Sequence, residues 1–142
     1  MEKTFIMIKP WSVKDAKEIL IELDDYGIRT RHTSVETVPR EVIQSHYAQH
    51  RGKPFFDYMT ESFVGKPVEI AVYEGRNVIA EMIEIIGVTD PAKADPNSIR
   101  ARYSTDSLEK ALREGRPLQN VIHRSDSLSE ALREIAVWQE YF

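Results

Sequence analysis

Residues 120–127, Asn-Val-Ile-His-Arg-Ser-Asp-Ser, are the stretch around which the rest of the chain can be interpreted. Val121 and Ile122 predict a short apolar strand that ends at His123, and residues 125–127 are helix-capping types that predict a helix start. The imidazole is therefore expected beside free backbone N–H groups and the positive end of a helix dipole, where a negatively charged substrate is favoured. Because histidine is nucleophilic near neutral pH, phosphoryl transfer through a phosphohistidine is one hypothesis. The alternative is a histidine that only satisfies a hydrogen bond at a strand end.

Length and composition predict one globular domain over residues 1–142. Apolar residues make up 42% and charged residues 30% of the chain, which is long enough to bury a core. The net charge of −4 gives no reason to expect a nucleic-acid partner, and without cysteine there is no disulfide framework or thiolate zinc site. No apolar run approaches membrane-spanning length and no signal peptide is recognisable, so we expect a cytoplasmic protein with no membrane partner.

Strand-like and helix-like patterns alternate along the chain. Runs rich in β-branched and aromatic residues predict strands, and apolar faces at helical spacing predict helices. Residues 88–119 are loop-like but contain one short helix with a capping start and a glycine stop. The predicted strands cover residues 4–8, 28–38, 68–73 and the stretch that holds His123; the predicted helices cover 12–26 (capped by Ser12), a segment opened by Pro39, 55–63, 76–86, 106–114 and 127–139.

This order of elements predicts an α/β fold of the α+β sandwich type. The first and third strands can lie centrally, as in a ferredoxin-like βαββαβ arrangement whose four-stranded antiparallel sheet has helices packed on it. One local repeat stands out, because residues 105–115, TDSLEKALREG, resemble residues 125–135, SDSLSEALREI. It is either a short duplication or two helices with the same capping chemistry, and we favour the second.

Several motifs together resemble one family. Asn-x-Ile-His-x-Ser-Asp-Ser at 120–127 is similar to the active-site signature of nucleoside diphosphate kinases, whose histidine is transiently phosphorylated. Thr-Phe-Ile-Met-Ile-Lys-Pro at 4–10, His-Tyr at 46–47, Ile-Gly-x-Thr-x-Pro at 86–91 and Pro-x-Ser-Ile-Arg at 96–100 match in the same order. Each motif alone is weak, but their order and spacing over nearly the whole chain are specific.

The resemblance assigns roles to residues of this chain. His123 would be the nucleophile, with Ser125 and Glu134 fixing its orientation. Positive and polar groups would bind the phosphates and the sugar. Two apolar side chains would hold the base by stacking and contact, whether it is a purine or a pyrimidine. The implied nucleotide-binding residues are Lys9, Tyr47, Phe55, Met59, Thr89, Arg100 and Asn120.

The resemblance also implies the reaction and its partners. A nucleoside triphosphate such as ATP or GTP would donate its γ-phosphoryl group to His123, and a nucleoside diphosphate would then accept it in the same pocket. Mg²⁺ would arrive with the nucleotide phosphates, since no dense carboxylate cluster indicates a metal site in the protein. The family implies a homo-oligomer, built from dimers into tetramers or hexamers.

The chain departs from the family pattern at several positions. Ile83 stands where the family usually has a phosphate-binding arginine, and Arg124 and Trp11 replace a glycine and an acidic residue. We expect Arg102 or Arg124 to supply the missing charge. The stretch between Arg100 and Asn120 is longer than usual by about one short helix. A nucleotide-binding relative with weakened catalysis, acting as an interaction or regulatory module, is therefore the alternative function.

The other histidines are not assigned to a site. His46 and His50 share a helix face at a spacing that a metal could use, but no third ligand lies nearby in the sequence. His32 lies among basic residues in a predicted strand and is expected at the surface.

Overall fold

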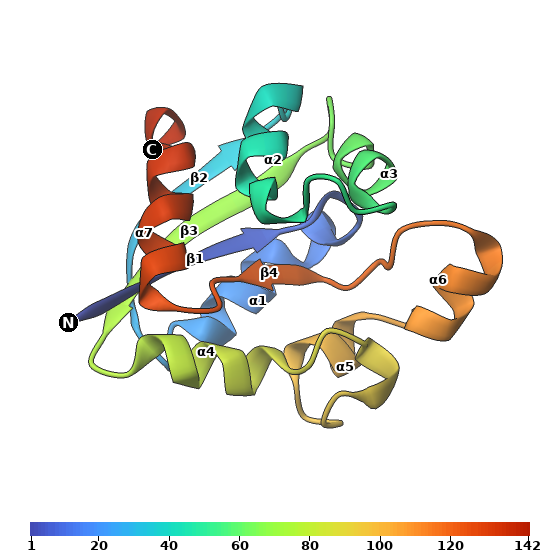
Figure 1. The fold of residues 1–142 in the computed structure, drawn as a ribbon. Coiled ribbons are helices and arrows are strands. Elements are labelled where there is room, and N and C mark those ends of the chain that lie inside the picture. Colours follow the sequence, from blue (N-terminus) through green and yellow to red (C-terminus); the bar gives the residue numbers. More distant parts are fainter.

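Four strands form one antiparallel sheet in the order β2-β3-β1-β4 in the computed structural model, which describes all 142 residues. The chain order of strands and main helices is that of a ferredoxin-like βαββαβ fold, so the predicted fold class is confirmed (Figure 1). The strands are β1 (Glu2–Ile8), β2 (Ile28–Val35), β3 (Val68–Gly75) and β4 (Ile122–Arg124), and the helices are α1 (Ala16–Leu23), α2 (Arg40–His46), α3 (Phe56–Glu61), α4 (Val78–Ile86), α5 (Ile99–Tyr103), α6 (Leu108–Glu114) and α7 (Leu128–Val137).

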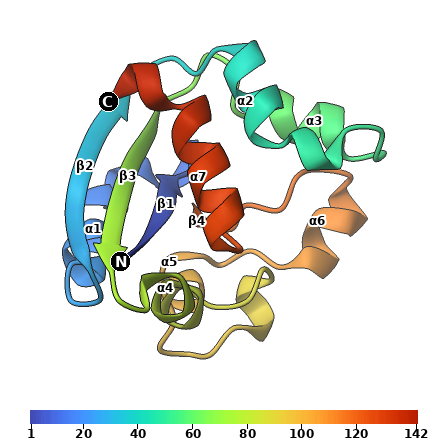
Figure 2. The same cartoon turned by 60° about the vertical axis from the view of Figure 1, so that its left-hand side comes forward.

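Hydrophobic side chains fill a core on each face of the sheet. Because side chains alternate along a strand, β1 sends Ile6 and Ile8 to the face covered by α1 and α4, and Phe5 and Met7 to the opposite face. Helices α2, α3 and α7 cover this second face, where Trp138 is fully buried. The sheet therefore lies between two layers of helices (Figures 1 and 2).

Three details differ from the predicted elements. A 3₁₀ turn at Pro10–Asp15 precedes α1, so the predicted cap Ser12 lies buried inside this turn and does not start a helix. The fixed φ of a proline at the first position favours such an early helical turn. The second strand ends at Val35 and not at residue 38. Helix α5 lies within the predicted loop, and it begins where the side chain of Ser98 accepts a hydrogen bond from the backbone N–H of Ala101.

The short edge strand β4 positions the central histidine. It pairs with β1 in antiparallel register, with His123 opposite Met7. Alternation along the strand sends Ile122 into the core beneath α4 and the ring of His123 toward α7. None of the helices is long and apolar enough to span a bilayer.

Candidate active site

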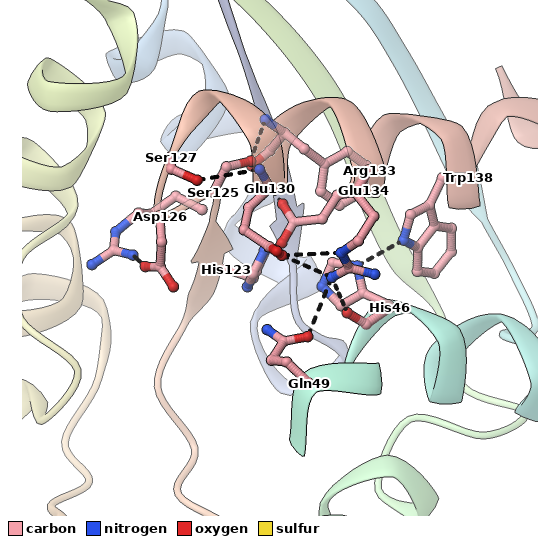
Figure 3. Close-up of polar contacts among 12 residues, drawn as sticks. His46, Gln49, His123, Ser125, Asp126, Ser127, Glu130, Arg133, Glu134 and Trp138 are labelled. Carbon is pink, nitrogen blue, oxygen red and sulfur yellow. Dashed lines mark hydrogen bonds and ion pairs between the residues drawn. The ribbon is translucent and has the colours of Figure 1, made fainter. Parts of the chain in front are cut away.

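A chain of hydrogen bonds fixes the orientation of His123 (Figure 3). The backbone N–H of Phe5 donates to Ser125 Oγ over 2.9 Å, and Ser125 Oγ donates to Glu134 Oε1 over 2.7 Å. Glu134 Oε2 lies 3.0 Å from His123 Nε2. The carboxylate of Glu134 can only accept, so the hydroxyl of Ser125 must donate to it, and His123 Nε2 must carry the proton of the last bond. The carboxylate of Glu134 therefore accepts from His123 Nε2–H, which leaves the lone pair of the neutral imidazole on Nδ1.

The charge state of the histidine agrees with this assignment. Burial lowers the pKa of His123 well below its usual value, so the ring is neutral at neutral pH. Three nearby cations, Lys9, Arg100 and Arg124, lower this pKa further because they repel an additional positive charge. Nδ1 makes no hydrogen bond within the protein. His123 thus presents an oriented, neutral ring nitrogen with a free lone pair, and the groups around it are positively charged.

Positive and polar groups gather beside the histidine. Lys9 Nζ donates to Asn120 Oδ1, and the amide nitrogen of Asn120 donates to the carbonyl of Thr89 over 3.0 Å. The guanidinium of Arg100 donates to the carbonyl oxygens at the end of α4 and in β4, at 2.8 and 2.7 Å. Burial and the charge of Arg100 lower the pKa of Lys9 to about 7. Tyr47 is buried with its ring 5.9 Å from that of His123, and burial raises the pKa of its hydroxyl.

A pocket of about 310 Å³ extends from this cluster. One end is polar, with Lys9, Thr89 and Asn120, and the rest is mostly apolar. Phe55 and Met59 of the α3 region line the apolar part. The pocket therefore brings together five of the seven residues that were predicted to bind a nucleotide. Helix α6 and the segment after it supply the pocket wall opposite α3. The residues of this wall are Leu108, Ala111, Leu112, Arg116, Pro117 and Leu118.

The residues at the unusual positions lie in different surroundings. Trp11 lines the pocket, and its indole N–H donates to the carbonyl of Asn120 over 2.9 Å. Ile83 packs against the core beneath α4. Arg102 is bound to Glu22 of α1, on the opposite side of the sheet from the histidine ring. Its contacts therefore do not support the expectation that Arg102 replaces the missing charge.

The structure gives His46 a place beside the histidine that sequence reasoning missed. His46 is fully buried, its ring centroid lies 4.4 Å from that of His123, and its Nδ1 accepts from the indole of Trp138 over 3.0 Å. The signal was available, because His46 lies three residues after Ile43 on the buried face of α2.

Three side chains around the histidine raise the question of a metal site. The ligand atoms of His46, His123 and Glu134 all lie within 4.8 Å of one another. However, Trp138 occupies the Nδ1 lone pair of His46, so the neutral ring carries its proton on Nε2 and has no lone pair there to offer. The donor set is therefore better suited to holding His123 than to binding a cation.

Comparison with known proteins agrees with this site. The sequence model described as nucleoside diphosphate kinase matches residues 2–141. Nucleoside diphosphate kinases of Carboxydothermus hydrogenoformans and Desulfitobacterium hafniense are 39% and 37% identical to the chain over 140 residues, which is 97% of this chain and 87% of theirs. The crystal structure of the nucleoside diphosphate kinase of Encephalitozoon cuniculi superposes with a TM-score of 0.83 at 32% identity, covering 97% of this chain and 88% of that one.

The fold and these relatives together define a nucleotide phosphotransferase. The chain belongs to the nucleoside diphosphate kinase family, and the resemblance stated from the sequence is confirmed.

Proposed function

We propose that this protein transfers the γ-phosphoryl group of a nucleoside triphosphate to a nucleoside diphosphate through a phosphohistidine on His123. The observation that carries the proposal is the hydrogen-bond chain from Phe5 through Ser125 and Glu134 to His123 Nε2. It leaves Nδ1 as the only ring nitrogen with a lone pair. A histidine with a purely structural role would not need its second nitrogen kept free beside a cluster of cations.

The proposed reaction has two matching halves. In the first, Nδ1 of neutral His123 attacks the γ-phosphorus, a P–N bond forms, and the bond to the β,γ-bridging oxygen breaks as the diphosphate leaves. In the second, a terminal oxygen of another diphosphate attacks the same phosphorus and the P–N bond breaks. Glu134 holds the Nε2 proton throughout and stabilises the positive charge that the ring gains. One site serves both halves because donor and acceptor present the same α- and β-phosphates to the same residues.

The polar end of the pocket would bind that phosphate chain. Arg100 and Lys9 would neutralise phosphate oxygens as their charge shifts during transfer. A phosphate beside Lys9 would also keep its ammonium charged, which offsets the lowered pKa of the free protein. Tyr47 and Thr89 would donate hydroxyl hydrogens, and Asn120 would bind a sugar hydroxyl or a phosphate oxygen without adding charge.

The apolar end would hold the base. Phe55 and Met59 would form one wall, and Leu108 and Leu112 of α6 would form the other. Stacking and apolar contact discriminate little between bases, so purines and pyrimidines would both be accepted. The additional helix thus belongs to the nucleotide pocket.

Mg²⁺ would enter with the nucleotide. Two carboxylates near the histidine are already engaged, since Glu134 accepts from Ser125 and His123 and Asp126 pairs with Arg124. This donor set fits an ion that is carried by phosphate oxygens and touches few protein groups. Bound there, the ion would neutralise charge on the transferring phosphates.

The test is transfer of label from [γ-³²P]ATP to the purified protein, followed by a chase with unlabelled GDP. Wild-type protein should take up acid-labile label and pass it to GTP, and His123→Ala should take up none. His32→Ala is the matched control, because His32 lies at the surface bound to Glu69 and should label normally. Nucleotide binding without any label would refute the kinase and support the alternative, a nucleotide-binding module with weakened catalysis.

The homo-oligomer of dimers and the cytoplasmic location implied by the sequence stay predictions. Sedimentation of the purified protein measures the first, and fractionation of cells measures the second.

A further inference from the structure

Several positively charged side chains surround His123, and their hydrogen-bond acceptors in the protein are mostly neutral. Lys9 donates to the neutral amide of Asn120, and Arg100 donates to two neutral carbonyls. The buried carboxylate of Glu134 already accepts from a serine and from the histidine itself. Arg124 adds a third cation, directly after His123 in the chain. Buried cations without matching anions are costly, so this cluster is built for an anionic ligand.

Arg124 lies at the free edge of the sheet, on the same side of β4 as Arg100. Arg100 donates to the carbonyl of Ile122 over 2.7 Å, while Val121 and Ser125 form backbone bonds to the β1 side of β4. The alternation of a strand therefore turns the backbone of Ile122 and Arg124 to the open edge. Two residues along a strand are about 6.7 Å apart. Arg124 is thus about one such spacing along β4 from the carbonyl that Arg100 binds, and its side chain leaves the strand on the face of Ile122. The charge of Arg124 lowers the pKa of both His123 and Arg100, so its guanidinium lies near both groups.

The side chain of Arg124 is only partly satisfied. It is 15% exposed, and its Nε is buried with no hydrogen-bond partner. Its one ion pair is to Asp126, whose side chain is 73% exposed. Nε of Arg100 is buried and unpartnered as well. A buried donor without a partner is unfavourable, and the oxygens of a phosphate are the acceptors that a planar guanidinium fork fits.

Arg102 provides the contrast within the same chain. Its guanidinium donates to both carboxylate oxygens of Glu22, and its Nε donates to the carbonyl of Asn97 over 3.1 Å. Every nitrogen of that side chain has a protein acceptor on the surface near α1. Arg102 therefore has a structural role. Arg124, in contrast, has a buried N–H group without an acceptor, close to His123.

We propose that Arg124 is a catalytic phosphate-binding residue, which gives up Asp126 and binds the terminal phosphoryl group while that group moves to Nδ1 of His123. The contact forms and breaks no covalent bond; it neutralises charge on the equatorial oxygens of the transferring group. The inference rests on the proposed function and names a second arginine, besides Arg100, that binds the γ-phosphate. Position 83 is apolar in this chain, so no arginine reaches the site from that part of α4.

The first experiment compares Arg124→Gln with Arg102→Gln in single-turnover labelling by [γ-³²P]ATP over a range of concentrations. At saturating ATP, Arg124→Gln should label about 100-fold more slowly than wild type, the cost of losing one charge contact made in the transition state. Arg102→Gln should label at the wild-type rate. Thermal unfolding of each variant establishes that it is folded. A folded Arg124→Gln protein that labels like wild type at saturation would overturn the inference.

A binding experiment separates this inference from the proposed kinase activity. Affinity for the β,γ-methylene analogue of ATP, measured by calorimetry, needs no transfer. Arg124→Gln should weaken this affinity about tenfold, with Arg124→Lys in between, because lysine keeps the charge but loses the fork. Equal affinity in wild type and Arg124→Gln, together with labelling of Arg124→Gln at the wild-type rate, would refute the role of Arg124. Wild-type protein that never labels would instead refute the kinase, and a tenfold loss of affinity in Arg124→Gln would still support phosphate binding.

Discussion

Helices α6 and α7 share most of their sequence but differ in what they do. Residues 105–115 read TDSLEKALREG and residues 125–135 read SDSLSEALREI. Both helices begin in the same way, because the capping serine accepts a hydrogen bond from the backbone N–H three residues later. Both bury the alanine at the centre of the repeat. Yet α7 packs on the sheet behind the histidine, and α6 stands at the edge of the molecule beside the pocket (Figures 1 and 2).

Equivalent side chains therefore have different roles. Glu134 of α7 is 1% exposed and holds His123, whereas its counterpart Glu114 in α6 is exposed and binds Arg116. The first aspartate of the repeat is buried in α6, as Asp106, and exposed before α7, as Asp126. Local sequence sets the helix and its cap, and the packing partner sets the function of each side chain. Substitutions at equivalent positions should separate these two contributions.

The largest difference is expected at the glutamates. In Glu134→Gln, the amide oxygen still accepts from Ser125, so the amide NH₂ faces His123 Nε2 and forces the imidazole proton onto Nδ1. Labelling of His123 should slow by at least about 100-fold, as expected for a wrong tautomer. Glu114→Gln should label normally. Equal labelling rates for Glu134→Gln and Glu114→Gln would refute the different roles assigned to the two glutamates.

The aspartates should differ in stability. Asp106 accepts two hydrogen bonds from Arg116 and one from the backbone N–H of Gln119, each 2.8 Å long. The guanidinium of Arg116 holds the pKa of Asp106 well below its usual range. Because the folded pKa is depressed, this contribution is complete above the unfolded pKa of about 4 and is lost as the pH falls through the lower folded value.

Asp106→Asn should therefore lower the urea midpoint of unfolding at pH 7 and lower it less at pH 3. Asp126→Asn should leave the midpoint unchanged at both values, since Asp126 is mostly exposed. If Asp106→Asn and wild type had equal urea midpoints at pH 7, the hydrogen bonds of Asp106 to Arg116 and Gln119 would contribute nothing to stability.

The leucines should differ in nucleotide affinity. Leu112 of α6 lines the pocket, whereas Leu132, its counterpart in α7, is exposed away from it. Leu112→Glu should raise the KM for nucleotides about fivefold, a loss of about 1 kcal/mol of apolar contact, with little change in kcat. Steady-state kinetics with Leu132→Glu as control checks this. A similar KM in both variants would place the base elsewhere.

The capping serines should give the smallest difference of all. Ser107→Ala and Ser127→Ala each remove one cap from the same type of helix start, so each should destabilise the protein by about 1 kcal/mol. Denaturant unfolding measures both. A much larger loss in one of them would show that its serine does more than cap its helix.

Much of the fold could be predicted from the sequence. Strand β1 and the helix–strand order follow from periodicity, and the central place of β1 and β3 follows from the topology. The ends of elements were less predictable: the 3₁₀ turn at Pro10 replaced a helix capped by Ser12, and α5 formed inside a proline-rich loop. Pro10 and the capping Ser98 favour these two helical turns, but such preferences do not decide which of several possible starts the chain uses.

The site shows the same division. The motif around His123 and the residues matched through the family were available in the sequence, and the pocket gathers five of them. The choice between Arg102 and Arg124 was not available, because it depends on Glu22, which is distant in the chain and binds Arg102. The burial of His46 could have been predicted from its spacing to Ile43, but its hydrogen bond to the indole of Trp138, 92 residues away in sequence, could not.

The most direct test of the account is the position of phosphate on the protein. After brief reaction with ATP, ³¹P NMR and mass spectrometry of the phosphoprotein at alkaline pH identify the modified residue and ring nitrogen. The hydrogen bond from Nε2 to Glu134 predicts phosphate on Nδ1 of His123 alone. Phosphate on Nε2, or on another residue, would contradict the central claim that Glu134 orients His123 for transfer.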